Sequence, residues 1–354
     1  MKAFKAYDIR GIYNEDFNKE DAYKIGYFLP ELLQADNVLV GRDARVSSDE
    51  IFEHLAQGII DSGANVYNIG LATTPMVYYV TAKHKFAASV QITASHNSRE
   101  YNGMKISRNN ALPVGFDTGL NKLLEMIQGR EIYIADKKGK IIDYKVKDEY
   151  LQFLKSYVQD YSDVNMAVDC SNGMAGLLIK KLLGKKPVYL YEDIDGSFPN
   201  HEPNPLIESN VEDLKKTVLN QKCDIGIIFD GDADRVMFVD EKGQFISPDL
   251  MIGFIANYFL EKESGAVLED IRTSKAVKEY VEKLGGEMHT WRVGRAYATP
   301  KLREIKGIFG GELAGHYYFR DFFYSDSGML AALIVLNLVS KFKKEGKVLS
   351  QLIS

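Results

Sequence analysis

The amino-acid sequence predicts an α/β fold made of several consecutive domains. Short apolar runs typical of buried strands alternate with helical patterns along the chain, and this alternation indicates sheets layered with helices. At 354 residues the chain is longer than one ordinary domain, so two or three domains are expected. A hydrophobic content of 45% is enough to give each domain a core.

The expected elements form sets of similar style along the chain. Strands are expected at residues 38–40, 65–69, 87–92, 166–168, 188–191 and 224–229. Helices are expected at residues 48–62, 176–183, 211–221 and 325–342. Charged stretches at 136–147 and 240–243 mark boundaries, so the expected domains are residues 1–143, 144–244 and 245–354.

The most informative run is Phe229 to Arg235, in which Asp230, Asp232 and Asp234 alternate directly after an apolar strand. Three carboxylates this close repel each other and raise each other's pKa unless a cation sits among them. A hard divalent ion, Mg²⁺ above all, prefers such oxygen ligands. Arg235 adds a fixed positive charge beside the site. A carboxylate-held cation next to an arginine suits a phosphoryl group in transit.

Three other interpretations of this run compete. It could be an acidic turn without a ligand, although turns seldom follow a buried strand with three spaced carboxylates. It could be an EF-hand loop with Glu241 at the twelfth position, but the sixth position, which needs glycine, is Arg235. It could open a phosphatase of the haloacid-dehalogenase type, but that motif requires Thr or Val where Asp234 stands.

A second run, Thr93 to Asn97, also follows an apolar strand, at residues 87–92. Ser95 in this polar loop is a candidate nucleophile or phosphate carrier. His96 is a poor base for it, because neighbouring side chains usually point apart. The nucleophile-elbow pattern of α/β hydrolases is absent from this run. The residues alone favour a phosphate carrier and a solvated turn about equally.

A third run, Gly310 to His316, brackets an acid and a histidine with glycines. The glycines leave the backbone open to a ligand. His316 could be a general acid or base near neutral pH. A lone histidine is more often structural, and Glu312 could equally be a solvated loop residue.

In this order the three runs resemble the α-D-phosphohexomutase superfamily, the phosphomannomutases and phosphoglucomutases. The similarity covers nearly the whole chain, and four further blocks support it. These are residues 4–11 (FKAYDIRG), 41–45 (GRDAR), 169–173 (DCSNG) and 201–205 (HEPNP). The resemblance implies three related α/β domains, each a mixed sheet between helices, that form part of a phosphohexomutase cleft.

The resemblance also implies roles for individual residues. Ser95 matches the phosphoserine, and it would complete the Mg²⁺ site of Asp230, Asp232 and Asp234. Residues implied around the transferring phosphoryl group are Arg10, Lys105 and Arg235, with His316 in proton transfer. Residues implied to contact the substrate are Tyr7, Arg272, Arg295, Glu312 and Gly315. The reaction would interconvert a hexose 1-phosphate and a hexose 6-phosphate through a hexose 1,6-bisphosphate.

Several positions depart from the family pattern and bear on the choice of sugar. Ser98 replaces a proline, Ala314 a serine, Arg272 a lysine and Arg295 a histidine. Arginine is not equivalent to lysine at a sugar contact. Leu313 stands where the glucosamine enzymes have glutamine, so mannose and glucose phosphates are the expected substrates and glucosamine phosphate is the alternative.

The run Arg-x-Ser-Gly-Thr, which in the family's fourth domain holds the substrate's other phosphate, does not occur in these 354 residues. We therefore expect domains one to three without the fourth, and slow or no turnover by this chain alone. The other hypothesis is a sugar-phosphate-binding or scaffold protein that retains the fold without catalysis.

Composition excludes some partners and suggests a compartment. A net charge of −5 argues against a nonspecific nucleic-acid surface. Cys170 and Cys223 lie in strand-like runs, and no signal peptide opens the chain, so buried thiols and a cytoplasmic location are expected. The apolar stretch 329–339 is too short to span a membrane, so we expect a buried helix there. The oligomeric state is not predicted.

Overall fold

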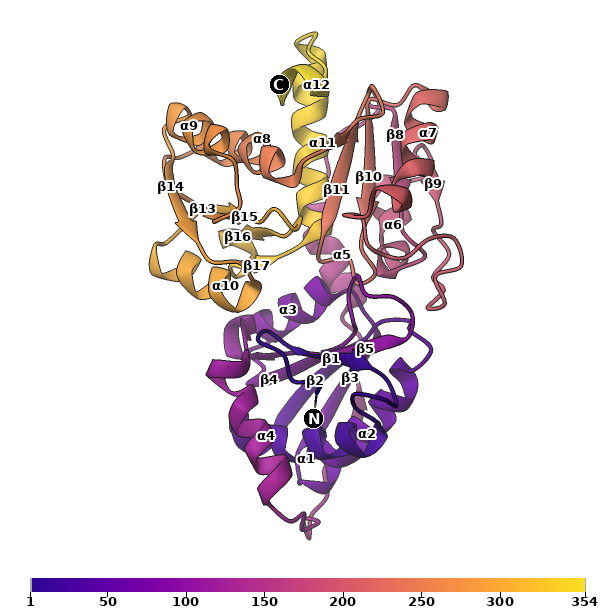
Figure 1. Cartoon of the computed structure of the whole chain (residues 1–354), viewed down its shortest axis with the longest axis vertical. Coiled ribbons are helices and arrows are strands. Elements are labelled where there is room, and N and C mark those ends of the chain that lie inside the picture. The colour runs from indigo at the N-terminus through magenta and orange to yellow at the C-terminus, as the bar shows by residue number, and fades with distance from the viewer. Residues whose placement is uncertain (1, 354) are drawn as a thin grey trace. The chain divides into compact units, whose positions relative to one another are not determined.

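The structure, a computed structural model, describes residues 2–353. These residues form two compact units, shown within Figure 1. The first unit holds residues 2–150 together with 195–197, and the second holds residues 151–194 and 198–353.

The first unit is built on one mixed sheet with the strand order β1-β5-β4-β2-β3-β7, and β6 pairs with β5. Its strands are β1 (Ile9–Ile12), β2 (Asn37–Arg42), β3 (Asn65–Leu71), β4 (Ala88–Ile92), β5 (Tyr101–Arg108), β6 (Leu112–Pro113) and β7 (Ile141–Asp143). Strands β4, β2, β3 and β7 run parallel, whereas β5 is antiparallel to both of its neighbours β1 and β4.

Helices cover both faces of this sheet. They are α1 (Lys19–Leu33), α2 (Ser48–Asp61), α3 (Thr74–Lys83) and α4 (Leu120–Gly129), and α5 (Lys147–Lys155) follows β7. Val38 and Val40 of β2 face the core that α1, α2 and α4 also line. Side chains alternate along a strand, so Gly41 faces the other side, where an added Cβ would lie 2.7 Å from Val77 of α3.

The second unit contains two five-stranded mixed sheets. The first has the order β12-β11-β10-β8-β9. Its strands are β8 (Met166–Asp169), β9 (Val188–Leu190), β10 (Ile225–Phe229), β11 (Val236–Asp240) and β12 (Phe245–Ile246), and its helices are α6 (Ile179–Leu183) and α7 (Glu212–Gln221). All five residues of β10 are buried, as expected for a central strand covered on both faces.

The other sheet has the order β14-β13-β15-β16-β17. Its strands are β13 (Ala266–Asp270), β14 (Glu287–Trp291), β15 (Phe309–Gly311), β16 (Tyr317–Phe319) and β17 (Ser325–Asp326). The helices of this part are α8 (Pro248–Leu260), α9 (Lys275–Lys283), α10 (Arg295–Glu304), α11 (Gly328–Lys344) and α12 (Leu349–Leu352).

Helix α11 packs against β11 of the first sheet and against α8 of the other part of the unit. Residues Gly328 to Ser340 of α11 are all buried. Asn337 accepts a hydrogen bond from Tyr161 at 2.8 Å and donates to the carbonyl of Tyr157 at 3.0 Å. Near the end of the helix, Lys343 pairs with Asp224, which precedes β10, at 2.6 Å. A helix this apolar on every side is therefore an internal element of the unit, as its sequence predicted.

Most expected elements lie within a residue or two of the observed ones, and three mixed sheets with helices confirm the predicted fold class. Two elements differ. The helix expected at 325–342 begins at Gly328, because Ser325 and Asp326 pair with β16 and Ser327 caps the helix through the amide of Leu330. The helix expected at 176–183 is two short pieces, since Leu178 leaves helical geometry with φ −129.

Both cysteines are buried free thiols, as expected, and burial raises the pKa of Cys170 and of Cys223. Among residues 2–353, no helix is long and apolar enough to cross a membrane.

Close packing of α1 on α2 gives a stability prediction. A Cβ atom on Gly58 would lie 2.0 Å from the carbonyl oxygen of Tyr23, which is backbone and cannot turn away. Gly58→Ala should therefore force the two helices apart and lower the free energy of unfolding by about 1–3 kcal/mol. Chemical denaturation monitored by circular dichroism measures this change. Gly129→Ala is the matched control, because a Cβ there meets nothing within 4 Å; equal stability of the two variants would contradict the prediction.

Candidate active site

Ser95 lies in the first unit, in the loop that joins β4 to β5. Its backbone is left-handed, with φ 53, and the residue is 1% exposed. Its amide donates to Thr93 Oγ1 at 2.9 Å. A left-handed backbone is unfavourable for a residue with a side chain, and it persists only where the surroundings impose it. The predicted phosphoserine therefore sits in a tightly held loop.

Two of the predicted basic residues come from strands of the same sheet. Arg10 of β1 lies opposite Gly103 of β5, and Lys105 follows two residues later, so both side chains project from one face of the sheet. Arg10 donates to the side chain of Asn97 in the serine loop at 2.9 Å and pairs with Asp8. Tyr7 precedes β1 and is 45% exposed.

The three aspartates lie in the second unit, in the short loop from β10 to β11. Asp230, Asp232 and Asp234 are all buried, and each offers an oxygen within 4.8 Å of the others. Ala233 supplies the tight bend with φ 60, and the amide of Arg235 donates to Asp230 at 3.2 Å. An all-oxygen donor set of this size and charge fits a hard divalent cation. The donor chemistry therefore matches the predicted metal site.

A neighbouring loop, residues 169–174 after β8, supports this aspartate loop. Ser171 Oγ donates to the carbonyl of Phe229 at 2.6 Å, and the amide of Met174 donates to the carbonyl of Gly231 at 2.9 Å. A Cβ on Gly173 would lie 2.7 Å from that same oxygen of Gly231. The two loops therefore touch backbone to backbone, which only glycine allows at this point.

A buried ion pair anchors the supporting loop. Asp169 accepts from the amide of Ser171 at 2.8 Å and from His201 Nε2 at 3.1 Å. The other ring nitrogen of His201 lies 2.8 Å from the carbonyl of Glu202, which can only accept. Burial by itself lowers the pKa of His201, but the hydrogen bond and charge of Asp169 outweigh it, so the pKa is raised. Burial raises the pKa of Asp169. Both nitrogens of His201 donate when the pair is ionised.

The glycine-bracketed loop at 310–316 pairs directly with the end of the aspartate loop. Arg235 and His316 form an antiparallel bridge, and the amide of Val236 donates to the carbonyl of Gly315 at 3.3 Å. Gly315 has φ 82, and a Cβ there would lie 2.5 Å from Met237. Gly328, at the start of α11, donates its amide to the carbonyl of Ala233 at 3.3 Å. Backbone contacts therefore join the loops of the two sheets in this unit.

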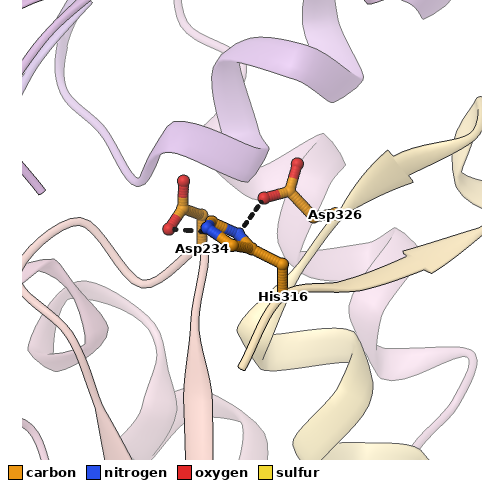
Figure 2. A group of neighbouring side chains, drawn as sticks. All are labelled: Asp234, His316 and Asp326. Carbon is orange, nitrogen blue, oxygen red and sulfur yellow. Dashed lines mark hydrogen bonds and ion pairs between the residues drawn. The ribbon is translucent and has the colours of Figure 1, made fainter. Parts of the chain in front are cut away.

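His316 lies between two carboxylates, Asp234 and Asp326, as Figure 2 shows. Its Nδ1 is 2.6 Å from Asp326 and 3.8 Å from Asp234. Arg235 Nε lies 2.9 Å from His316 Nε2, and a guanidinium nitrogen can only donate. The proton of the neutral ring is therefore on Nδ1 and points to Asp326. By distance the three residues could also hold a metal ion, but a protonated Nδ1 cannot be a ligand.

The remaining predicted substrate contacts lie around this loop. Glu312 is 3% exposed and accepts from the amide of Gly294 at 3.2 Å and from the hydroxyl of Tyr318 at 2.6 Å. Burial raises the pKa of Glu312. Arg295 donates to Asp326 at 3.2 Å, on the carboxylate that also holds His316.

Arg272 is anchored through Asp270 at the end of β13. Burial favours a higher pKa for Asp270, but hydrogen bonds from Arg272 outweigh it, so the pKa of this carboxyl is lowered. The same carboxylate accepts from the amide of Leu313 at 2.8 Å, next to Glu312. Arg272 and the glycine-bracketed loop therefore share one anchor.

The structure thus brings the predicted residues together in two groups. Arg10 and Lys105 share the sheet of Ser95, while the aspartates, Arg235, His316, Glu312, Gly315, Arg272 and Arg295 lie in the second unit. Sequence reasoning missed Asp326, Asp169 and His201, whose importance comes from contacts. Asp169 and His201 stand in the family blocks at 169–173 and 201–205, but no sequence pattern indicated that the two residues pair.

Comparison with known proteins agrees with this arrangement. Models of the phosphoglucomutase/phosphomannomutase α/β/α domains I, II and III match residues 1–131, 148–243 and 247–354 respectively. The chain belongs to this family. The family assignment confirms the predicted α-D-phosphohexomutase resemblance, while the domain boundaries given from the sequence stay a prediction.

Several family members are similar over most of this chain. A phosphomannomutase of Escherichia coli strain K12 is 36% identical over 353 residues, covering 96% of this chain and 77% of the relative. A protein named phosphohexose mutases, from Xanthomonas campestris pv. campestris strain B100, is 36% identical and covers 100% of this chain and 80% of its own length.

Among solved structures, a phosphoglucomutase/phosphomannomutase family protein from Burkholderia thailandensis superposes with a TM-score of 0.87 at 30% identity. The match covers 96% of this chain and 77% of that protein. These relatives indicate that the chain is an isomerase that acts on hexose phosphates, and the solved structure agrees with its fold.

The backbone contact between Gly173 and Gly231 gives a prediction about metal binding. Gly173→Ala should push the aspartate loop away from its support and weaken Mg²⁺ binding by about tenfold, the usual effect of losing an outer-shell contact. Isothermal titration of the purified chain with MgCl₂ measures the affinity. The same substitution at Gly129, where a Cβ has open space, should leave the affinity unchanged. Equal affinities for the two variants would show that the support is dispensable.

Proposed function

We propose that this chain is a Mg²⁺-dependent phosphohexomutase that interconverts hexose 1-phosphates and hexose 6-phosphates through a phosphoserine at Ser95. The observation that carries the proposal is the buried group Asp230, Asp232 and Asp234, whose loop is joined by backbone bonds to the loop of His316. Family membership, which rests on matches to residues 1–131, 148–243 and 247–354, supports the same reaction. The alternative of a non-catalytic binding protein leaves this costly cluster of buried carboxylates without a purpose.

The metal-binding residues would be the three aspartates, with an oxygen of phosphorylated Ser95 completing the set. When bound, Mg²⁺ neutralises charge on the phosphoryl group and holds it in line. Arg235, half-buried beside the aspartates, presents a fixed positive charge for the same group. Arg10 and Lys105 provide positive charge on the serine side.

Proton transfer is assigned to His316. Its Nδ1 proton is held by Asp326, so Nε2 is the nitrogen able to accept a proton from a sugar hydroxyl. In this structure Arg235 donates to Nε2, and that contact must give way when a phosphoryl group takes up the guanidinium. Asp326 thereby fixes the tautomer of His316 and determines that Nε2 is the nitrogen that accepts the proton, as the aspartate of a Ser-His-Asp triad does for its histidine.

Sugar binding is assigned to Glu312, Arg272, Arg295, Gly315 and Tyr7. A carboxylate buried among hydrogen bonds suits a pair of ring hydroxyls, because it is already aligned when the sugar arrives. Mannose and glucose phosphates are the proposed substrates, and the intermediate is hexose 1,6-bisphosphate.

Two measurements on the purified chain test the proposal. Incubation with glucose 1,6-bisphosphate and Mg²⁺ should add one phosphate to Ser95, which intact mass and peptide mapping detect. ³¹P NMR then measures the rate at which mannose 1-phosphate and glucose 1-phosphate are converted to the 6-phosphates, and we expect this conversion to be slow. The absence of both phosphorylation and conversion would refute the proposed function. A clear preference for glucosamine phosphate would refute the proposed sugars.

Ser95→Ala should abolish phosphoryl transfer and leave the fold intact, because the side chain's own packing contribution is small. We expect the rate of phosphate uptake to fall by more than about a thousandfold, as for loss of a covalent nucleophile. Ser107→Ala is the matched control, a buried serine of β5 that takes no part in the proposed chemistry. Substantial turnover by Ser95→Ala would rule out the phosphoserine.

Asp232→Asn should weaken Mg²⁺ binding by at least about tenfold, because one of three ligand charges is lost while the shape is kept. Calorimetric titration of the chain measures this directly. Asp240→Asn should bind Mg²⁺ normally, since its amide oxygen can still accept from the amides of Lys242 and Gln244. Full activity in excess chelator, or unaltered binding by Asp232→Asn, would exclude this metal site.

A further inference from the structure

A buried arginine, Arg45, lies beneath the loop that carries Ser95. Arg45 is 2% exposed, and the sequence analysis assigned it no role. Its two terminal nitrogens donate to four carbonyl oxygens, three in the serine loop and one on Tyr101 at the start of β5. Nη1 reaches those of Ser98 at 2.6 Å and Tyr101 at 3.0 Å, and Nη2 reaches those of Ser95 at 2.9 Å and Asn97 at 2.6 Å.

The fit of the guanidinium to this loop is complete. A guanidinium has five N–H donors in one plane, one on Nε and two on each terminal nitrogen. Nε donates to Asp43 at 3.2 Å, so each of these donors faces an acceptor. An ammonium group has three donors and no fixed plane, so lysine could not satisfy the same carbonyls. The loop is therefore shaped around this one side chain.

Asp43 connects Arg45 to the strand end before Ser95. One carboxylate oxygen accepts from the Arg45 amide at 3.0 Å, and the other accepts from Thr93 Oγ1 at 2.7 Å. Thr93 in turn accepts from the amide of Ser95 at 2.9 Å. Ser95 is thus held on both sides of its left-handed backbone, at its amide through Thr93 and at its carbonyl by Arg45.

From these contacts we propose that Arg45 is a positioning residue for phosphoryl transfer. It fixes the backbone around Ser95 so that the hydroxyl, and later the phosphate, points in one direction. A buried cation that costs desolvation, and whose two terminal nitrogens bind four backbone oxygens, is explained by the loop it holds. The proposal rests on the proposed function, since it assigns how the carrier serine of that reaction is aimed.

The step that Arg45 serves is the priming of Ser95 by a hexose bisphosphate. The Ser95 Oγ–P bond forms as a sugar O–P bond breaks, and the hydroxyl proton passes to the departing sugar oxygen. In-line transfer depends on placement of the attacking oxygen, and a misplacement of about 1 Å can cost about a hundredfold in rate. The five N–H donors of Arg45 face Asp43 and four backbone carbonyls, so its substitution should lower the phosphorylation rate and leave Mg²⁺ affinity unchanged.

The test compares Arg45→Lys with Arg42→Lys in the full chain. Arg42→Lys is the matched control, because Arg42 pairs with the exposed Asp49 and is not among the residues proposed to bind metal, phosphate or sugar. The rate of Ser95 phosphorylation by glucose 1,6-bisphosphate is followed by intact mass. Mg²⁺ affinity of the unphosphorylated chain is measured in parallel by calorimetry.

Arg45→Lys should lower the phosphorylation rate by about a hundredfold and leave Mg²⁺ affinity within about twofold, while Arg42→Lys changes neither. A folded Arg45→Lys chain that takes phosphate within about threefold of the normal rate overturns the proposal. A parallel loss of Mg²⁺ affinity also overturns it, because the effect would then be general unfolding.

A second variant covers the case in which Arg45→Lys does not fold. Thr93→Val keeps the shape of the side chain and removes the hydroxyl that accepts from Ser95, so it should also slow phosphorylation at normal Mg²⁺ affinity. An unchanged rate in Thr93→Val would contradict the positioning account.

Hydrogen exchange separates this proposal from the proposed function. The amides of Asn97 and Tyr101 bond within the serine loop, to the carbonyls of Ala94 and Ser98 at 3.1 Å each. Arg45→Lys should speed exchange in peptides spanning them and not in those spanning Asp230 to Asp234. If the unchanged chain takes no phosphate, the proposed function fails. Unchanged exchange would then independently reject the role of Arg45.

Discussion

The second unit is organised around one electrostatic constraint, the burial of Asp230, Asp232 and Asp234 in a single short loop. Three carboxylates removed from water cost several kcal/mol each unless a cation and hydrogen bonds compensate them. A loop with this much buried charge has to be held in place by its neighbours. Backbone contacts from the loop at 169–174 and from Gly315 and Gly328 provide that support.

The same support connects the proposed metal-binding residues to the residues proposed to bind the sugar. Because Arg235 pairs with His316 through both backbone and side chain, movement of one loop is passed to the other. Asp326 continues the connection to Arg295. A charged ligand that displaced Arg235 from His316 would therefore affect the aspartate loop and the loop of His316 together. Such coupling suits a reaction in which the phosphoryl group must be in position when the proton is transferred.

The serine loop and the aspartate loop, which lie in different units, are both held in place with the help of a buried ion pair. Each follows a strand of a mixed sheet. The pair Asp43 and Arg45 holds the serine loop directly, and the pair Asp169 and His201 holds the segment that supports the aspartate loop. Buried pairs of this kind contribute little net stability. Their value lies in direction, since the arginine or histidine presents fixed donors to backbone carbonyls and the aspartate presents fixed acceptors to backbone amides.

The sequence by itself determined the α/β class and most strands, because apolar periodicity and local motifs encode strands and the loops that end them. The same motifs predicted the candidate site residues Ser95, Asp230, Asp232 and Asp234. The sequence also predicted the family. Tertiary structure decided what lies far apart in sequence: Arg45 under Ser95, His201 on Asp169, and Asp326 on His316. It also moved the start of α11 to Gly328, because Ser325 and Asp326 join β16. Such contacts depend on register between strands and on hydrogen-bond geometry, which neither composition nor spacing specifies.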